Sequence, residues 1–248
     1  MTRREQRRLA FLRVSGWEHV QITPLAGDAS NRRYLRLTGN PDHRRAILMD
    51  ADPNTVGMQQ AFVEMASYLI DAGFSAPHIF AADLAQGFVL LEDFGDAVFA
   101  RMLVDAPAQE AALYRSAADC LAALHRQPAA KHLLQTTPDV LAKLIAPAFE
   151  WYAAKAAPDN TQNAQTATVA LLATSLQRHA PQCSVTVLRD FHAENLIWLP
   201  GRKGICRVGL LDFQDAVIGH PAYDLVSLTR DARRDLGPGV AALTTEHY

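Results

Sequence analysis

The sequence predicts an α+β fold of two lobes, with an antiparallel sheet in the N-lobe and mainly helices in the C-lobe. Segments with the alternating apolar pattern of strands occupy much of residues 1–92. Beyond residue 92 the apolar residues recur at helical spacing instead. Short apolar strands then return within residues 185–211 and carry polar residues beside them. This order favours a cleft between an N-lobe at residues 1–92 and a C-lobe at residues 93–248.

The N-lobe is expected to start with a short amphipathic helix that ends at Gly16. Alternating residues predict strands around 20–22, 34–37 and 46–49, with a turn of small residues between the first two. Apolar residues at helical spacing predict a helix over residues 58–69, which Gly73 closes. Strands are expected again around 79–81 and 87–91. The N-lobe should therefore be an antiparallel sheet with one long helix.

The C-lobe is expected to contain helices over residues 107–126 and 138–155 and a third that runs to about His179. Pro147 predicts a break or kink in the second helix, because proline cannot donate the backbone hydrogen bond of a helix interior. Short strands follow around 185–188, 196–199 and 208–211. One helix should begin after Pro221 and another after residues 237–239.

Composition argues against several classes of protein. The net charge of −2 and the 49% hydrophobic content are ordinary for a globular chain, so no nucleic-acid partner is expected. No apolar stretch approaches the roughly 20 residues that a membrane span needs. The basic N-terminus lacks the apolar core of a secretory signal, which makes the cytoplasm the expected location. Cys120, Cys183 and Cys206 form no Cys-x-x-Cys pair, so neither a zinc site nor a disulfide framework is predicted.

Two polar segments carry the residue types that phosphoryl transfer requires. The first holds Asp190 and, five residues later, Asn195. The second places Asp212 directly after an apolar strand. Phosphoryl transfer needs a carboxylate to orient or deprotonate the attacking hydroxyl, and oxygen ligands for the magnesium that neutralises the phosphates. The spacing therefore predicts a phosphotransferase, although the first segment by itself could be an ordinary turn.

The Asp-x-x-x-x-Asn spacing, followed 17 residues later by Asp212, resembles the catalytic loop and metal-binding aspartate of protein-kinase-like folds. Residues 121–125 and 188–195 are similar to motifs of the aminoglycoside phosphotransferase superfamily. Within that superfamily, residues 27–34, 90–96 and 211–225 resemble the anomeric kinases. Those enzymes phosphorylate the C1 hydroxyl of N-acetylmuramate or N-acetylglucosamine.

The resemblance implies an ATP-dependent kinase that uses Mg2+ and acts on a small-molecule sugar in cell-wall sugar recycling. Asp190 matches the catalytic base, and Asn195 and Asp212 match the magnesium ligands. Glu92 and its neighbours match the hinge, whose backbone faces adenine. Related kinases continue with several more helices, so we expect C-terminal helices of the fold to be truncated after Tyr248.

The expected phosphate-binding residues depart from the broader superfamily. The turn with Gly27 and Ser30 matches the loop that covers the nucleotide phosphates. The lysine expected on the third strand is absent, because all four lysines lie beyond residue 130. Arg32 and Arg33 are the expected replacements, with Arg36 as a further candidate, since guanidinium groups pair well with phosphate. The anomeric kinases share this Arg-Arg-Tyr pattern, so the departure favours the narrower family.

Several residues are expected to support the site. Leu188 stands where the superfamily often has histidine. His192 is expected to buttress the catalytic loop by a hydrogen bond, and His125 to be a satisfied histidine of the core. Asp224, at a helix start, is expected to be a structural carboxylate that bonds to the catalytic-loop backbone.

Some alternatives stay open. Asp215 either contacts the sugar or a second metal, or is a solvated turn residue. Glu64 either pairs with a phosphate-binding cation or is an exposed helix residue. For the whole chain, one alternative is a kinase of an aminoglycoside or a choline-like amine, which calls for an acidic pocket. The other is a nucleotide-binding pseudokinase, which the missing lysine favours.

Overall fold

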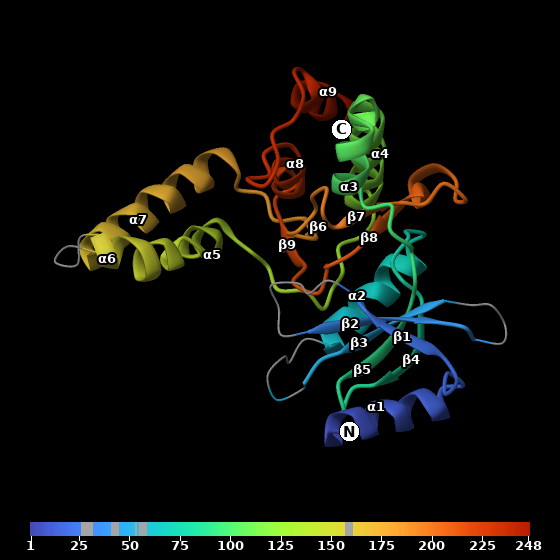
Figure 1. Ribbon diagram of the computed structural model, residues 1–248. Helices are drawn as coiled ribbons and strands as arrows, with labels where there is room; N and C mark the ends of the chain where they lie inside the picture. The colour runs from blue at the N-terminus through green and yellow to red at the C-terminus, as the bar shows by residue number, and fades with distance from the viewer. Residues whose placement is uncertain (26–31, 41–44, 53, 55–58, 157–160) are drawn as a thin grey trace.

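A computed structural model gives the fold over residues 1–25, 32–40, 45–52, 54, 59–156 and 161–248. The N-lobe holds a five-stranded antiparallel sheet of order β1-β2-β3-β5-β4 (Figure 1). The five strands predicted for this lobe are confirmed within one or two residues at each end. They are β1 (Gln21–Pro24), β2 (Arg33–Thr38), β3 (Ala46–Asp50), β4 (Ile79–Asp83) and β5 (Phe88–Glu92).

Two helices cover opposite faces of this sheet (Figure 1). Helix α1 (Arg3–Val14) buries Phe11 and Leu12 against the face that carries Leu35 and Leu37. Helix α2 (Gln59–Asp71) lies on the other face and packs its apolar stripe against Met49 and the C-lobe core. Successive residues of a strand point to opposite faces, so β2 sends its even-numbered side chains towards α2.

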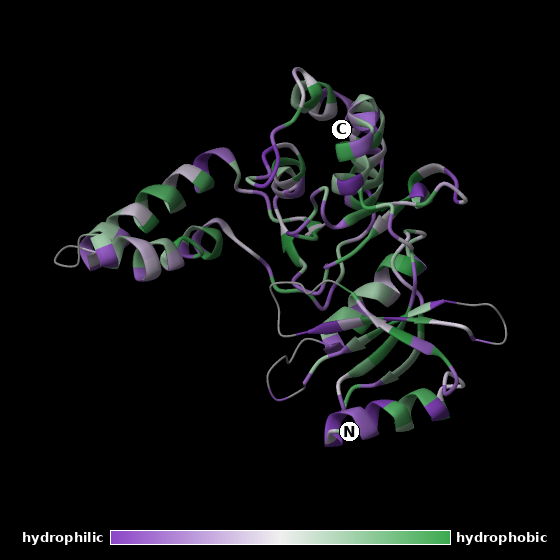
Figure 2. Cartoon of the chain, viewed as in Figure 1, coloured by the Kyte–Doolittle hydropathy of each residue, from purple (hydrophilic) through white to green (hydrophobic). Residues whose placement is uncertain are grey.

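An ion-pair cluster attaches α1 to the edge of the core. The Nε of Arg4 donates to Asp50 Oδ1 at 2.7 Å, and Arg8 Nη1 lies 3.4 Å from Asp50 Oδ2. The Asp50 side chain is only 5% exposed, and the Arg4 guanidinium also stacks 3.9 Å above the Phe88 ring. Figure 2 shows the start of α1 as hydrophilic. Arg4 and Arg8 of this basic segment therefore hold α1 against Asp50 of β3.

The C-lobe is mainly helical, as predicted. The predicted break at Pro147 is confirmed, because α5 ends at Lys143 and a π-helical turn, Ala148–Ala153, follows the proline. Helix α7 buries none of its described side chains, and with α5 and α6 it extends away from the rest of the lobe (Figure 1). The helices are α3 (Phe99–Asp105), α4 (Glu110–His125), α5 (Pro138–Lys143), α6 (Ala154–Ala156), α7 (Thr161–His179), α8 (Ala222–Thr229) and α9 (Val240–His247).

Two small antiparallel sheets join these helices. Strand β6 (Val185–Val187) pairs with β9 (Val217–Gly219), and β7 (Leu196–Trp198) pairs with β8 (Val208–Leu210). Neither β9 nor α3 was predicted, because three and seven residues are too few for a clear period. None of the described helices is both long and apolar enough to cross a membrane.

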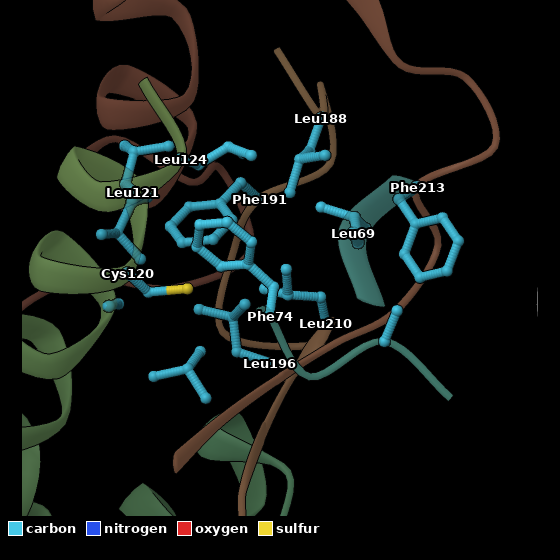
Figure 3. Close-up of a cluster of buried hydrophobic side chains, with 14 of the residues drawn as sticks. Leu69, Phe74, Cys120, Leu121, Leu124, Leu188, Phe191, Leu196, Leu210 and Phe213 are labelled. Atoms are coloured by element: carbon cyan, nitrogen blue, oxygen red, sulfur yellow. The ribbon is translucent and has the colours of Figure 1, made fainter. Parts of the chain in front are cut away.

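One apolar core runs through both lobes (Figure 3). Leu69 and Phe74 of the N-lobe lie in the same cluster as Leu124, Leu188 and Phe191 of the C-lobe. At its edge, the ring of Phe62 on α2 stacks on Phe213 with centroids 5.0 Å apart. Each large apolar side chain buried in this way contributes roughly 1.5–3 kcal/mol. The core therefore ties α2 to the segment that follows Asp212.

The ion-pair cluster on α1 gives a first prediction. Asp50→Asn should lower the free energy of unfolding by roughly 1–3 kcal/mol, because it leaves two arginines without their buried carboxylate. Urea unfolding measures the change. The matched control is Asp71→Asn, at an exposed carboxylate that ends α2. Equal stability of the two variants would show that the cluster contributes nothing.

Candidate active site

The β7–β8 hairpin brings the two expected metal ligands to one end. Leu196 pairs with Leu210, so the residue before β7 lies beside the residues after β8. The backbone N–H of Leu211 donates to the carbonyl of Asn195 at 3.0 Å. Asn195 and Asp212, 17 residues apart in the sequence, therefore meet because an antiparallel hairpin joins them.

The catalytic loop is held from α8. The N–H groups of Leu188 and Arg189 donate to the two oxygens of Asp224 at 2.6 and 2.9 Å. Ser227 Oγ donates to the carbonyl of Arg189 at 3.1 Å. These three bonds hold Arg189 at φ +72°, a left-handed conformation that side chains other than glycine seldom adopt. The prediction that Asp224 bonds to the loop backbone is confirmed.

Asp224 is completely buried, and burial raises its pKa to about 7. The hydrogen bonds from the two backbone N–H groups act in the opposite direction, since they stabilise the ionised carboxylate. The charge of Asp190 adds to the upward shift. Asp224 therefore couples the stability of the fold to the geometry of the loop that bears Asp190.

Asp190 follows the strained residue and remains accessible, with 40% of its side chain exposed. Burial raises its pKa, and the nearby carboxylate of Asp212 raises it further. His192 opposes this shift, with its Nε2 3.9 Å from Asp190 Oδ1. A carboxylate with a raised pKa is a stronger proton acceptor, which suits a group that takes a proton from a hydroxyl.

The donor atoms beside Asp190 fit a magnesium ion. Asn195 Nδ2 donates to the carbonyl of Asp190 at 3.0 Å and lies 3.4 Å from His192 Nε2, which leaves the amide oxygen as the donor for a cation. Asp212 has a φ of +56° and accepts from Gln214 Nε2 at 2.8 Å through Oδ1. In the described part of the chain, no three His, Cys, Asp or Glu side chains gather as a metal cage. Magnesium needs few protein ligands, because it keeps waters and substrate phosphates.

The structure separates the expected phosphate-binding arginines. Arg32 is 9% exposed and its Nη2 lies 3.9 Å from Oδ1 of Asp212, a predicted magnesium ligand. Arg33 lies on the other face of β2, which also carries Leu35 and faces α1. Gly27 and Ser30 lie outside the described residues.

Arg36, the further phosphate candidate, is occupied by two carboxylates of the predicted hinge. Its guanidinium binds Asp93 at 2.9 Å, and its Nη1 binds Asp96 at 2.9 Å. Asp93 Oδ1 also accepts from the N–H of Gly95, whose φ is +83°. The Asp93 side chain is 1% exposed. These contacts occupy Arg36 and fix the turn of the hinge.

Glu92 is held from the C-lobe side. Its backbone N–H donates to the carbonyl of His78 at 2.8 Å. Its carboxylate pairs with Arg202, which also donates from Nη1 to Ser75 Oγ at 2.7 Å and stacks on Phe94. Arg202, in the turn between β7 and β8, was not singled out from the sequence, because no local pattern marks a contact across 110 residues.

A pocket of about 540 Å³ opens beside Asp190. Its lining residues all belong to the C-lobe and come from the catalytic loop, α5, the end of α7 with Ala180 after it, and residues 220–233 around α8. They include Arg189, His192, Tyr223 and Arg230. This volume is typical of small-molecule sites, so the pocket is the candidate acceptor site.

Three residues considered from the sequence lie in other surroundings. His125 Nδ1 lies 2.5 Å from the Tyr248 hydroxyl, and burial lowers the pKa of His125 to about 4, but its Nε2 is buried without a hydrogen-bond partner among the described residues, so the predicted core histidine is only partly satisfied. Glu64 is exposed and accepts a hydrogen bond from Gln60, which favours the alternative that it is an exposed helix residue. Gln214 Nε2 donates to Asp212 Oδ1 at 2.8 Å and to Asp215 Oδ2 at 3.3 Å, so it links Asp215 to a predicted magnesium ligand.

The two-lobed fold and this arrangement at the hairpin end define a small-molecule phosphotransferase of the kinase-like type. The chain belongs to the phosphotransferase enzyme family, whose model matches residues 21–248. It is similar to an N-acetylmuramate/N-acetylglucosamine kinase of Caulobacter vibrioides. The identity is 37% over an alignment of 280 positions, which covers 99% of this chain and 76% of the relative. The enzyme of that name from Pseudomonas aeruginosa is 33% identical over 88% of this chain and 63% of its own length.

Solved structures show the same fold at low identity. A choline kinase from Streptococcus pneumoniae superposes with a TM-score of 0.71 and 15% identity, over 98% of this chain and 80% of its own. The ADP-bound aminoglycoside phosphotransferase APH(2'')-Ib superposes with a TM-score of 0.70 and 14% identity, over 97% and 81%. The kinase-like α+β fold predicted from the sequence is thereby confirmed.

The buried carboxylate of α8 generates the second prediction. Asp224→Ala should lower the free energy of unfolding by roughly 2–4 kcal/mol, because two backbone N–H groups lose their acceptor. Its pH dependence has a definite sign. The folded pKa of about 7 lies above the ordinary value of 3.8, so the stabilising contribution is full below about pH 4 and is lost as the pH rises through 7.

Urea unfolding at about pH 5 and about pH 8 tests both statements. The loss of stability in Asp224→Ala should be larger at the lower pH. Asp235→Ala, at an exposed carboxylate beyond α8, is the control. A loss that grows with pH would contradict the raised pKa.

Proposed function

We propose that this protein is an ATP-dependent kinase that phosphorylates the C1 hydroxyl of N-acetylmuramate or N-acetylglucosamine in cell-wall sugar recycling. The observation that carries the proposal is the placement of Asp190, with a raised pKa, between the Asn195–Asp212 pair and a sugar-sized pocket. The two relatives with 37% and 33% identity are named N-acetylmuramate/N-acetylglucosamine kinases, which supports the proposed substrates. A single centre therefore has a base, donors for a metal and room for an acceptor.

Asp190 is the proposed catalytic base. It orients the C1 hydroxyl and accepts its proton as the oxygen forms a bond to the γ-phosphorus and the bond from that phosphorus to the bridging oxygen of ADP breaks. The pocket wall beside Asp190 comes from Arg189 and His192 and positions the sugar. Correct placement of the two reactants supplies much of the rate, because little covalent chemistry is asked of the protein.

Asn195 and Asp212 are the proposed magnesium ligands, through the amide oxygen and a carboxylate oxygen. A bound magnesium ion would neutralise phosphate charge during transfer. The left-handed backbone of Asp212 and the bond from Gln214 keep its carboxylate in place. Asp190 needs no metal bond for its role, since its own position is set by the loop.

The nucleotide is proposed to lie against the hinge, with its phosphates near Arg32. The Arg36–Asp93 and Arg202–Glu92 pairs hold the hinge backbone still, which suits recognition of adenine by backbone groups. Arg32 reaches Asp212 from the N-lobe and offers a guanidinium where a lysine is missing. Gly27 and Ser30 are proposed to cover the phosphates, as the family resemblance implies.

The two alternative functions have less support. A cationic amine acceptor calls for an acidic pocket, yet three arginines, Arg189, Arg230 and Arg233, line this one beside two aspartates. A pseudokinase would not require the ordered Asp190–Asn195–Asp212 centre. Magnesium-dependent ATP binding without phosphorylation of any acceptor would favour the pseudokinase.

The proposed base gives the third prediction. Asp190→Asn should lower kcat for sugar 1-phosphate formation by about 1,000-fold, because the amide cannot accept the hydroxyl proton. ADP release with each of the two sugars measures the rate. Glu194→Gln, at an exposed residue of the same loop, should keep wild-type turnover. Wild-type-like turnover in Asp190→Asn would overturn the assignment of the base.

The separation of the arginines gives the fourth prediction. Arg32→Gln should raise the KM for ATP by roughly tenfold, since a charge-assisted contact to phosphate is lost. Arg33→Gln should have a smaller effect, because Arg33 lies on the opposite face of β2. Initial rates at varied ATP compare the two variants. An equal or larger effect of Arg33→Gln would refute the placement of phosphates at Arg32.

A further inference from the structure

We infer that Arg230, together with Arg189 and Arg233, forms a carboxylate-recognition site at the acceptor pocket, which makes the protein prefer N-acetylmuramate to N-acetylglucosamine. This inference rests on the proposed function and deepens it. The three arginines come from the catalytic loop, the end of α8 and the segment after α8, and all line the pocket that holds Asp190.

The charges in this pocket are not balanced by the protein. Arg233 Nη1 pairs with Asp231 Oδ1 at 3.0 Å, and the Asp231 side chain is only 3% exposed. Arg189 and Arg230 have no ion pair within 4.0 Å among the residues that the structure describes. Asp190 faces the reacting hydroxyl. Arg230 therefore remains for an anionic part of the acceptor, with Arg189, whose charge also acts on Asp190, beside it.

The placement of the pocket argues against the nucleotide phosphates as this anion. All lining residues of the pocket belong to the C-lobe, and the expected phosphate ligand Arg32 is not among them. Arg230 is the C-cap residue of α8, and its side chain is exposed. An anion bound there lies on the acceptor side of Asp190.

Of the two proposed acceptors, only N-acetylmuramate carries a carboxylate. N-acetylmuramate is N-acetylglucosamine with a lactyl ether, and that group ends in a carboxylate. Both sugars present the same C1 hydroxyl to Asp190. A carboxylate site should therefore change the affinity for one sugar and not for the other, whereas a role for these arginines in phosphoryl transfer would change the rates with both.

The test compares the two sugars in the same variants. Arg230→Gln should lower kcat/KM for N-acetylmuramate by about fivefold, as expected for an exposed ion pair, and lower the value for N-acetylglucosamine much less. Arg230→Lys should restore part of the loss, because it keeps the charge. Raising the salt concentration should lower only the N-acetylmuramate value.

Arg115→Gln, at an exposed arginine of α4 outside the pocket, is the matched control and should change neither sugar. Equilibrium binding of each sugar to the same proteins, measured by calorimetry, gives a readout that needs no turnover. Equal losses for both sugars in Arg230→Gln would overturn the carboxylate site while the kinase assignment stands. If neither sugar is phosphorylated, the proposed function fails, and selective loss of N-acetylmuramate binding still supports the site.

Discussion

The carboxylate of Asp224 is the constraint on which the active-site geometry depends. It is completely buried, and it accepts the N–H groups of two consecutive residues of the catalytic loop. A buried charge is costly unless it is hydrogen-bonded, so this position can be occupied only while the loop keeps its conformation. The left-handed Arg189 is the visible result, and Asp190 takes its direction from it. Stability and catalytic geometry are joined at this one side chain.

The remaining site residues are brought together by a hairpin within the C-lobe and by packing between the lobes. The β7–β8 hairpin places Asn195 beside the segment of Asp212, and the stack of Phe62 on Phe213 fixes that segment under α2. The arginines in different parts of the fold bind different carboxylates. Those of α1 hold Asp50, those at the hinge hold Asp93 and Glu92, and Arg32 meets Asp212.

The acceptor side explains how one fold can serve different substrates. A choline kinase and aminoglycoside phosphotransferases share this architecture at 14–15% identity. The charge of a pocket depends on a few side chains around the loop, because function is set by the site and not by the fold. In this chain the charged side chains of the pocket are three arginines and two aspartates, and they lie in the catalytic loop and at the end of α8.

The alternation of residues 34–37 and 46–49, the helical spacing of the C-lobe and the spacing of Asp190 and Asn195 are local signals. They were enough to predict the strands, most helices and the class of chemistry, because backbone periodicity depends on near neighbours. Which arginine reaches Asp212, which ones hold the hinge and which ones line the pocket were decided only in the tertiary structure. These contacts join residues that lie up to 180 apart in the chain, as Arg32 and Asp212 do. Alternation along β2 assigns each side chain to a face, but what that face meets depends on the packing of the two lobes, which sequence neighbours do not encode.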